Sequence, residues 1–95
     1  RGAKQEMYEG GIRIPCAVRW PAQIPAGRVS DQVALLMDWF PTLCDAAGAD
    51  IPPGIDGRSL TPLLRGGTVD FSDRTCYWVR REGGAWGAHR YHGQD

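Results

Sequence analysis

The chain has 95 residues, of which 42% are hydrophobic and 23% are charged, a composition typical of a globular protein. Its 11 basic and 11 acidic residues balance to a net charge of zero, which argues against a general nucleic-acid-binding protein, because such proteins usually carry a basic face. No apolar run approaches the ~18 residues that cross a bilayer, so the sequence predicts no membrane span.

The N-terminal segment holds the main candidate for chemistry. Lys4 is a compact charge with three hydrogen-bond donors, which suits a tetrahedral oxyanion such as sulfate or phosphate. Gly10 and Gly11 allow turn or bulge geometry closed to other residues, so Tyr8 and Glu9 can be held at the mouth of a following strand. A solvated loop lysine also fits these residues taken alone.

The first predicted strand covers residues 12–20, where apolar residues alternate with Arg13, Pro15, Ala17 and Arg19. Pro15 removes a donor from the ladder, so this strand is expected at a sheet edge or interrupted there. A short apolar run over residues 33–37 fits either a second strand or an extended approach to a helix.

A helix is predicted after Asp38, which is a suitable N-cap, with Pro41 in the first turn and Gly48 closing the end. One long helix from Ser30 to Ala47 would place Pro41 in mid-helix at a cost of about 3 kcal/mol, so the break is favoured. One face of the helix is predicted to pack on a sheet, namely Phe40, Leu43, Cys44 and Ala47.

Shorter elements follow. A helix is predicted to start near Ser59, with Pro62 in its first turn, and to end before Gly66 and Gly67. Further on, we expect a turn at residues 70–73, a strand over residues 74–81, a hairpin loop over residues 82–87, and a frayed end over residues 89–95.

The possible metal ligands do not form a set. Cys16, Cys44 and Cys76 are odd in number and lack a Cys-x-x-Cys pair, so they are interpreted as structural or incidental, with Cys16 and Cys44 packing as small hydrophobes. His89 and His92 could share a metal, but no nearby carboxylate or cysteine completes the site. Among the acids, Asp38 is better explained as a helix cap and Asp56 as a turn former.

Taken together, the ordered motifs resemble those of the sulfatase family, part of the alkaline-phosphatase-like superfamily. The resemblance covers residues 2–66 and extends to the segment at residues 77–84. The pieces that carry it are Gly2, Lys4, residues 8–15, 19–21, 24–27 and 30–31, Asp38, residues 41–43, 47–48, 55–60 and 62–64.

The resemblance implies an α/β fold, in which this chain forms a partial mixed sheet with flanking helices. Residues 1–95 are then one incomplete segment from the C-terminal part of a sulfatase catalytic domain. A chain that opens inside a motif is expected to be cut from something longer, and its modest core is expected to need the remainder of that domain as its partner.

The chemistry implied by the resemblance is hydrolysis of sulfate esters. In sulfatases a formylglycine made from the cysteine of a Cys-x-Pro-Ser-Arg motif attacks sulfur, and a divalent cation, usually calcium, polarises the sulfate. Lys4 matches the lysine that binds a sulfate oxygen, and Tyr8, Glu9 and Arg13 match the supporting motif, with Glu9 and Arg13 expected to form an ion pair or backbone clamp.

Calcium and formylglycine are expected from outside this chain, because no metal site is predicted here and Asn is absent. Cys76 and Arg80 have the nucleophile motif's separation, but Trp78 and Val79 replace its Pro and Ser, so Cys76 is rejected as the nucleophile.

Two alternatives stay open: a phosphate mono- or diester hydrolase of the same superfamily, and a non-catalytic structural or binding remnant. The expected substrate is a sulfated small molecule or glycan, and the 95 residues alone are expected to be inactive. The resemblance is compatible with a periplasmic or secreted protein, but the sequence leaves the location open.

Overall fold

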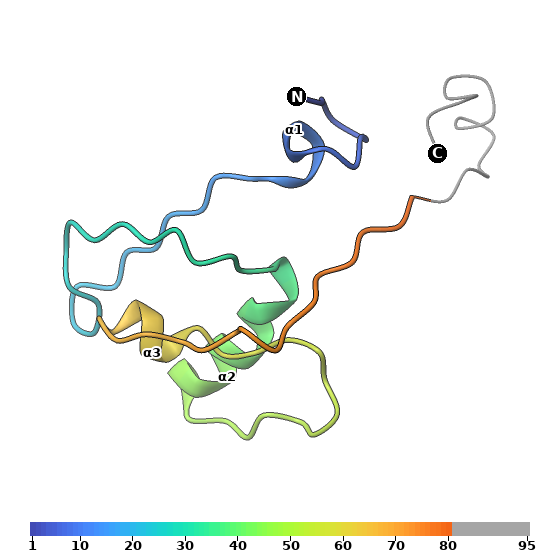
Figure 1. Ribbon diagram of the computed structural model, residues 1–95. Helices are drawn as coiled ribbons and strands as arrows, with labels where there is room; N and C mark the ends of the chain where they lie inside the picture. Colours follow the sequence, from blue (N-terminus) through green and yellow to red (C-terminus); the bar gives the residue numbers. More distant parts are fainter. Residues whose placement is uncertain (81–95) are drawn as a thin grey trace. The chain divides into compact units, whose positions relative to one another are not determined.

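The computed structural model describes residues 1–80. It contains four short helical elements, which are α1 (Glu9–Ile12), the 3-10 helix η1 (Leu36–Asp38), α2 (Trp39–Ala47) and α3 (Thr61–Leu64) (Figure 1). These residues form two compact units. The first comprises Arg1–Cys16 with residues 74–80, and the second comprises Ala17–Asp73. No helix in the described part is long and apolar enough to cross a membrane.

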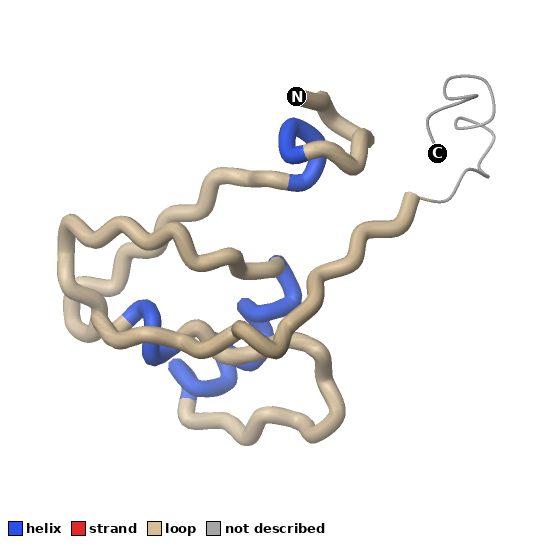
Figure 2. Tube along the Cα trace, in the orientation of Figure 1, coloured by secondary structure: helices blue, strands red, loops and turns tan. Residues whose placement is uncertain are grey.

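Residues 1–80 contain no β-strand (Figure 2). The strand predicted over residues 12–20 is absent, because Ile12 ends α1 and residues 13–20 are irregular. Residues 74–80 are likewise irregular, and the rest of that predicted strand lies outside the described residues. An alternating pattern becomes a strand only when a neighbouring strand supplies the ladder hydrogen bonds. The partial mixed sheet therefore stays a prediction.

The boundaries of α2 are as predicted. Asp38 occupies the N-cap position, Pro41 lies in the first turn, and Gly48 ends the helix with a left-handed φ of 69°. The Gly48 N–H donates to the carbonyls of Asp45 and Cys44, which satisfies the last turn. The break before Pro41 is confirmed, since η1 precedes α2 and residues 31–35 approach it as irregular chain.

The predicted packing face of α2 is wrong. Phe40 and Leu43 are 54% and 61% exposed, whereas Pro41 and Thr42 are buried. The helix contacts η1 and α3 instead of a sheet. Helical spacing identifies residues that share a face, but the neighbouring elements decide which face is covered.

The prediction of α3 is confirmed with a shift of two residues at its start. The helix begins at Thr61, contains Pro62 in its first turn, and ends before Gly66. Leu60, which immediately precedes it, is 3% exposed and is the one residue of the apolar core within the described part, apart from the buried ring of Pro41.

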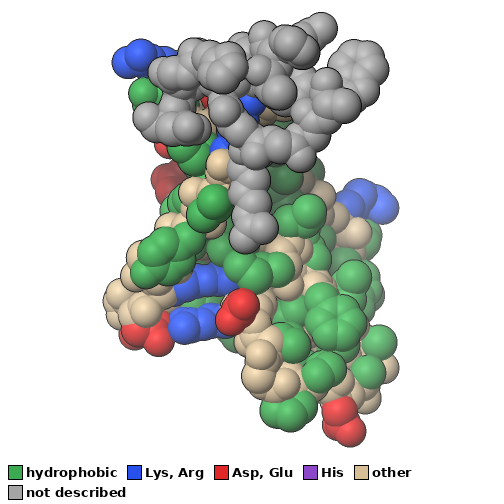
Figure 3. All heavy atoms as spheres, turned by 90° about the vertical axis from the view of Figure 1, so that its right-hand side faces the viewer, with side chains coloured by type: hydrophobic (Ala, Val, Ile, Leu, Met, Phe, Trp, Pro, Cys, Tyr) green, Lys and Arg blue, Asp and Glu red, His purple; other side chains and the backbone are tan. Residues whose placement is uncertain are grey.

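Most large apolar side chains in the described part are at least partly exposed (Figure 3). Val29 and Tyr77 are examples, at 90% and 81% exposure. Cys16 is exposed, against the expectation that it packs as a small hydrophobe, while Cys44 and Cys76 are half-buried, and all three are free thiols. The observed apolar core is thus smaller than the modest core expected from the chain length.

Candidate functional site

Lys4 lies in a tight turn that is closed by two hydrogen bonds. The Glu6 N–H donates to the Ala3 carbonyl over 3.0 Å, and the Ala3 N–H donates to Glu6 Oε2 over 2.7 Å. Gln5 has a φ of 77°, the positive value that the third residue of a type II turn requires. Lys4 is the second residue of the turn, and its side chain is exposed.

Glycines hold this turn against α1. The Gly10 N–H donates to the Arg1 carbonyl over 2.9 Å, so residues 1–6 run directly over the helix backbone. A Cβ at Gly10 would overlap the Gly2 carbonyl, and a Cβ at Gly11 would overlap the Glu6 carbonyl. The two glycines therefore allow a close approach of backbone to backbone within a helical turn, where a turn or bulge before a strand had been expected.

The predicted supporting residues lie in α1 and at its two ends, and residues 1–13 are named here the Lys4 corner. Arg13 and Glu9 form an i, i+4 ion pair with 3.6 Å between Nη1 and Oε1, and the Arg13 N–H donates to the Glu9 carbonyl over 2.8 Å. Both side chains are exposed, so the pair contributes at most about 0.5 kcal/mol. The Arg1 guanidinium lies 4.8 Å from the centroid of the Tyr8 ring, and that ring is half-exposed.

A second polar cluster joins η1, α2 and the segment before α3, and it consists of Leu35, Asp38, Thr42, Arg58 and Leu60. The fully buried Asp38 carboxylate accepts the Leu35 N–H over 2.7 Å and the Arg58 N–H over 2.9 Å. The side chain therefore holds a distant loop, and it makes no N-cap hydrogen bond to α2, contrary to the capping role predicted from sequence.

Thr42 completes this Asp38 cluster. Its hydroxyl donates to the Asp38 carbonyl over 2.6 Å and accepts the Leu60 N–H over 2.8 Å. The Arg58 guanidinium extends the cluster outward with two hydrogen bonds to Asp73, of 2.6 and 3.1 Å. Since these acidic and hydroxyl groups bind the protein's own backbone and side chains, their role is structural.

The residues that the structure describes do not fit a metal centre. No group of three or more His, Cys, Asp or Glu side chains gathers among residues 1–80. Each oxygen of Asp38 accepts a backbone N–H, and Asp56 is exposed in an irregular loop. Cys76 and Arg80 lie in the irregular segment 74–80, and His89 and His92 lie outside the described residues.

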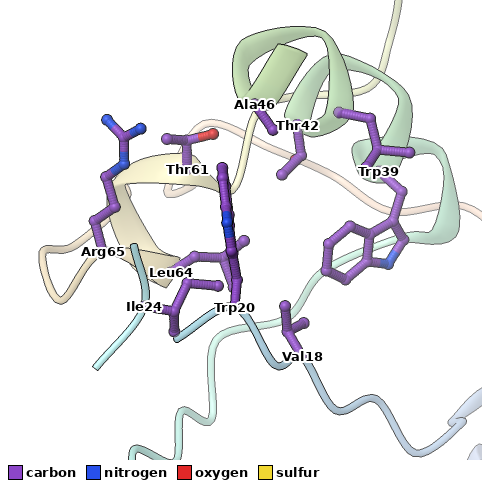
Figure 4. Close-up of a pocket in the computed structure, with 10 residues that line it drawn as sticks. Val18, Trp20, Ile24, Trp39, Thr42, Ala46, Thr61, Leu64 and Arg65 are labelled. Atoms are coloured by element: carbon purple, nitrogen blue, oxygen red, sulfur yellow. The ribbon is translucent and has the colours of Figure 1, made fainter. Parts of the chain in front are cut away.

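An apolar pocket lies within the second unit (Figure 4). Trp20 and Trp39 line it together with Val18, Ile24, Leu43, Ala46 and Leu64, and Thr42, Thr61 and Arg65 add the polar side chains. The Thr42 hydroxyl is already used by Leu60, which leaves few groups to bind an oxyanion. The pocket suits hydrophobic contact, so Lys4 remains the candidate for anion chemistry.

Comparisons with known proteins identify the family. A family model described as N-sulphoglucosamine sulphohydrolase, C-terminal, matches residues 3–84. The chain is 53% identical to mouse (Mus musculus) steryl-sulfatase over 68 residues, which are 70% of this chain and 11% of the relative. The chain belongs to the sulfatase family.

Two further sulfatases are similar to this chain. Dog (Canis lupus familiaris) N-acetylgalactosamine-6-sulfatase is 43% identical over 79 residues, 81% of this chain and 15% of the relative. Human (Homo sapiens) arylsulfatase D is 49% identical over 61 residues, 62% of this chain and 10% of the relative. The chain thus spans roughly a tenth to a seventh of the length of these relatives, and no solved structure matches it.

Of the site residues predicted from sequence, Glu9 and Arg13 pair with each other and Tyr8 contacts Arg1, while the exposed Lys4 side chain lies on the neighbouring turn. Sequence reasoning missed Glu6, whose carboxylate closes the turn that carries Lys4. Ala3 is not a capping residue, so the sequence carried no capping-box signal for this hydrogen bond.

Proposed function

We propose that the protein is a sulfuric ester hydrolase in which Lys4 binds a sulfate oxygen of the substrate. The observation that carries the proposal is the closed turn of residues 3–6, which presents an exposed lysine within a segment matched by the sulfatase family model. Lys4 is the sole lysine of the sequence, so no other lysine of this chain can take its place.

The role proposed for Lys4 is electrostatic. Within residues 1–80 its ammonium has no ion-pair partner, which leaves its donors available for an oxyanion. Donors held in place before the reaction stabilise the negative charge that develops on the oxygens of the transition state. The Tyr8, Glu9 and Arg13 side chains are proposed to act indirectly, because Glu9 pairs with Arg13 along α1 and Tyr8 contacts Arg1, whose carbonyl accepts the Gly10 N–H.

The described residues fit neither the cation nor the formylglycine that sulfatases use. The ligand groups do not gather, and the sequence contains no Cys-x-Pro-Ser-Arg motif. We propose that both groups come from polypeptide beyond this chain, and that the 95 residues alone are inactive. The substrate proposed is a sulfated small molecule or glycan, because the names of the relatives include steryl, aryl and N-acetylgalactosamine-6 sulfatases.

A phosphate ester hydrolase is the second candidate, since phosphate and sulfate are similar in shape and a lysine binds both. Sulfate is favoured here by the family match. Parallel assays with an aryl sulfate and the matching aryl phosphate would separate the two activities. Hydrolysis of neither ester would support a non-catalytic remnant instead.

The test is the substitution Lys4→Gln in the intact enzyme that carries this segment. We expect kcat/KM for an aryl sulfate to fall by about 100-fold or more, because one preorganised donor to the transition state is lost. Lys4→Arg should retain more activity, since it keeps the charge while changing its shape. The matched control is Arg19→Gln, which removes an exposed cation of the second unit. Wild-type kcat/KM in Lys4→Gln would overturn the role of Lys4.

A further inference from the structure

We propose that Glu6 is a positioning residue for Lys4, an inference that rests on the proposed function of the Lys4 corner. Glu6 does not touch the substrate in this proposal. It fixes the backbone from which Lys4 reaches the sulfate.

The two hydrogen bonds between Ala3 and Glu6 run in opposite directions. The backbone N–H of Glu6 donates to the Ala3 carbonyl over 3.0 Å, and the backbone N–H of Ala3 donates to Glu6 Oε2 over 2.7 Å. Together they enclose Lys4 and Gln5. The second bond depends on the Glu6 side chain, so the turn loses one of its two closing hydrogen bonds when the carboxylate is removed.

The conformation of the turn explains why it needs this second bond. Gln5 has a φ of 77°, in the left-handed region that is unfavourable for residues with a Cβ. Such a conformation persists only where the surrounding structure enforces it. The Glu6 bond is one of the contacts that do so, and the backbone bond from Gly10 to Arg1 is another.

The Glu6 carboxylate lies close to Gly2. A Cβ at Gly2, whose φ is 99°, would lie 3.1 Å from Glu6 Oε2 and 2.8 Å from the Tyr8 Cβ. Glu6 is half-buried, in contrast to its exposed neighbours Lys4 and Gln5. The absence of a side chain at residue 2 therefore makes the space in which the carboxylate meets the Ala3 N–H.

The charge of Glu6 would oppose anion binding if the carboxylate were free. Here it accepts a short, charge-assisted hydrogen bond from a backbone amide, which partly neutralises it. No ion pair joins Glu6 to Lys4 within the described part of the chain. The carboxylate thus shapes the turn, and the ammonium stays available for the oxyanion.

The experiment measures kcat and KM of the intact enzyme for an aryl sulfate in four forms: wild type, Glu6→Ala, Lys4→Gln and the double variant. We expect Glu6→Ala to lower kcat/KM by about fivefold, the effect of one ordinary hydrogen bond, with an unchanged melting temperature. In the Lys4→Gln background the same change should have no further effect, because Glu6 acts through Lys4.

Two other variants define the chemistry of the effect. Glu6→Gln should restore most of the activity, since its amide oxygen can accept the Ala3 N–H. Asp50→Ala, which removes an exposed carboxylate of the second unit, should leave kcat/KM unchanged.

The outcomes separate the two proposals. A Glu6→Ala effect of equal size in both backgrounds would overturn the positioning role while leaving the role of Lys4 intact. The positioning role would also fail if Glu6→Gln were as damaging as Glu6→Ala, because a hydrogen-bond acceptor would then not be what matters. Wild-type activity in Lys4→Gln alone would overturn the proposed function.

Discussion

The Lys4 corner and the Asp38 cluster are built in opposite ways. The corner is held mainly by backbone hydrogen bonds and by glycines that let one backbone segment lie against another, with one side-chain bond from Glu6, and the Lys4 side chain stays exposed. The Asp38 cluster is held by side chains, since the buried Asp38 and Thr42 bind the backbone of Leu35, Arg58 and Leu60.

This difference distinguishes polar side chains that are available to a ligand from polar side chains that hold the structure together. Where glycines and backbone groups provide the structure, a charged side chain such as Lys4 remains available to a ligand. Where polar side chains provide the structure, as Asp38 and Thr42 do, their hydrogen-bonding capacity is already used. The comparison therefore supports the role proposed for Lys4 in the corner and indicates a structural role for the cluster.

Removing the Asp38 carboxylate has the largest expected effect among the tests of this comparison. Asp38→Ala would leave the N–H groups of Leu35 and Arg58 without their acceptor at a buried site. At about 1–3 kcal/mol for each of the two unsatisfied groups, we expect the free energy of unfolding to fall by about 2–6 kcal/mol. Chemical denaturation of the intact protein, followed by fluorescence, would measure the change.

Asp50→Ala is the matched control, because it removes an exposed carboxylate, and surface changes usually cost under about 0.5 kcal/mol. Asp38→Asn should lie between the two, since the amide keeps one acceptor oxygen. Equal stability of Asp38→Ala and Asp50→Ala would show that the Asp38 cluster is not the structural element described.

The substitution Gly10→Ala tests whether the glycine contacts of the corner position Lys4. The new Cβ would overlap the Gly2 carbonyl and lie 3.0 Å from the Arg1 carbonyl oxygen, so residues 1–6 would have to move away from α1. We expect a cost of about 1–3 kcal/mol from the overpacking and a loss of activity comparable to that of Lys4→Gln. Steady-state kinetics and thermal unfolding of the same variant would measure both effects.

Gly54→Ala serves as the control for this substitution. Gly54 has a φ of 75°, but no heavy atom lies within 4 Å of the position that an alanine Cβ would take, so the change adds backbone strain without a clash. It should lower stability slightly and leave activity unchanged. Full activity in Gly10→Ala would contradict the idea that the close approach of residues 1–6 to α1 positions Lys4.

The sequence predicted local boundaries well because they depend on local sterics. Pro41 and Gly48 constrain α2 through their own backbone preferences, and the structure places the helix between Asp38 and Gly48 as expected. In the Lys4 corner the sequence predicted the ion pair of Glu9 and Arg13, but not the helix α1 or the turn of residues 3–6.

Burial and side-chain partners were less predictable, since they depend on residues far along the chain. Asp38 was expected to cap α2, but its carboxylate binds the backbone of Arg58, 20 positions away. Phe40 and Leu43 were expected to be covered and are exposed. Glu6 was missed because its role depends on the positive φ of Gln5, which glutamine gives no reason to expect.

The smallest predicted effect concerns Asp70, an exposed aspartate that contrasts with the buried Asp38. Asp70 is fully exposed, and hydrogen bonds with the Ser72 side chain and backbone N–H lower the pKa of its carboxyl below the ordinary value of 3.8. A lowered pKa stabilises the fold above pH 3.8, and this contribution is lost as the pH falls through the pKa of the folded state. We expect Ser72→Ala to move the pKa of Asp70 back toward 3.8 without a measurable change in unfolding free energy at neutral pH, because the group is exposed to solvent.

An NMR titration of the Asp70 carboxyl carbon would measure the shift. An unchanged pKa in Ser72→Ala would mean that the backbone hydrogen bond alone holds the carboxylate, and a large loss of stability would mean that burial is not what distinguishes the Asp38 cluster.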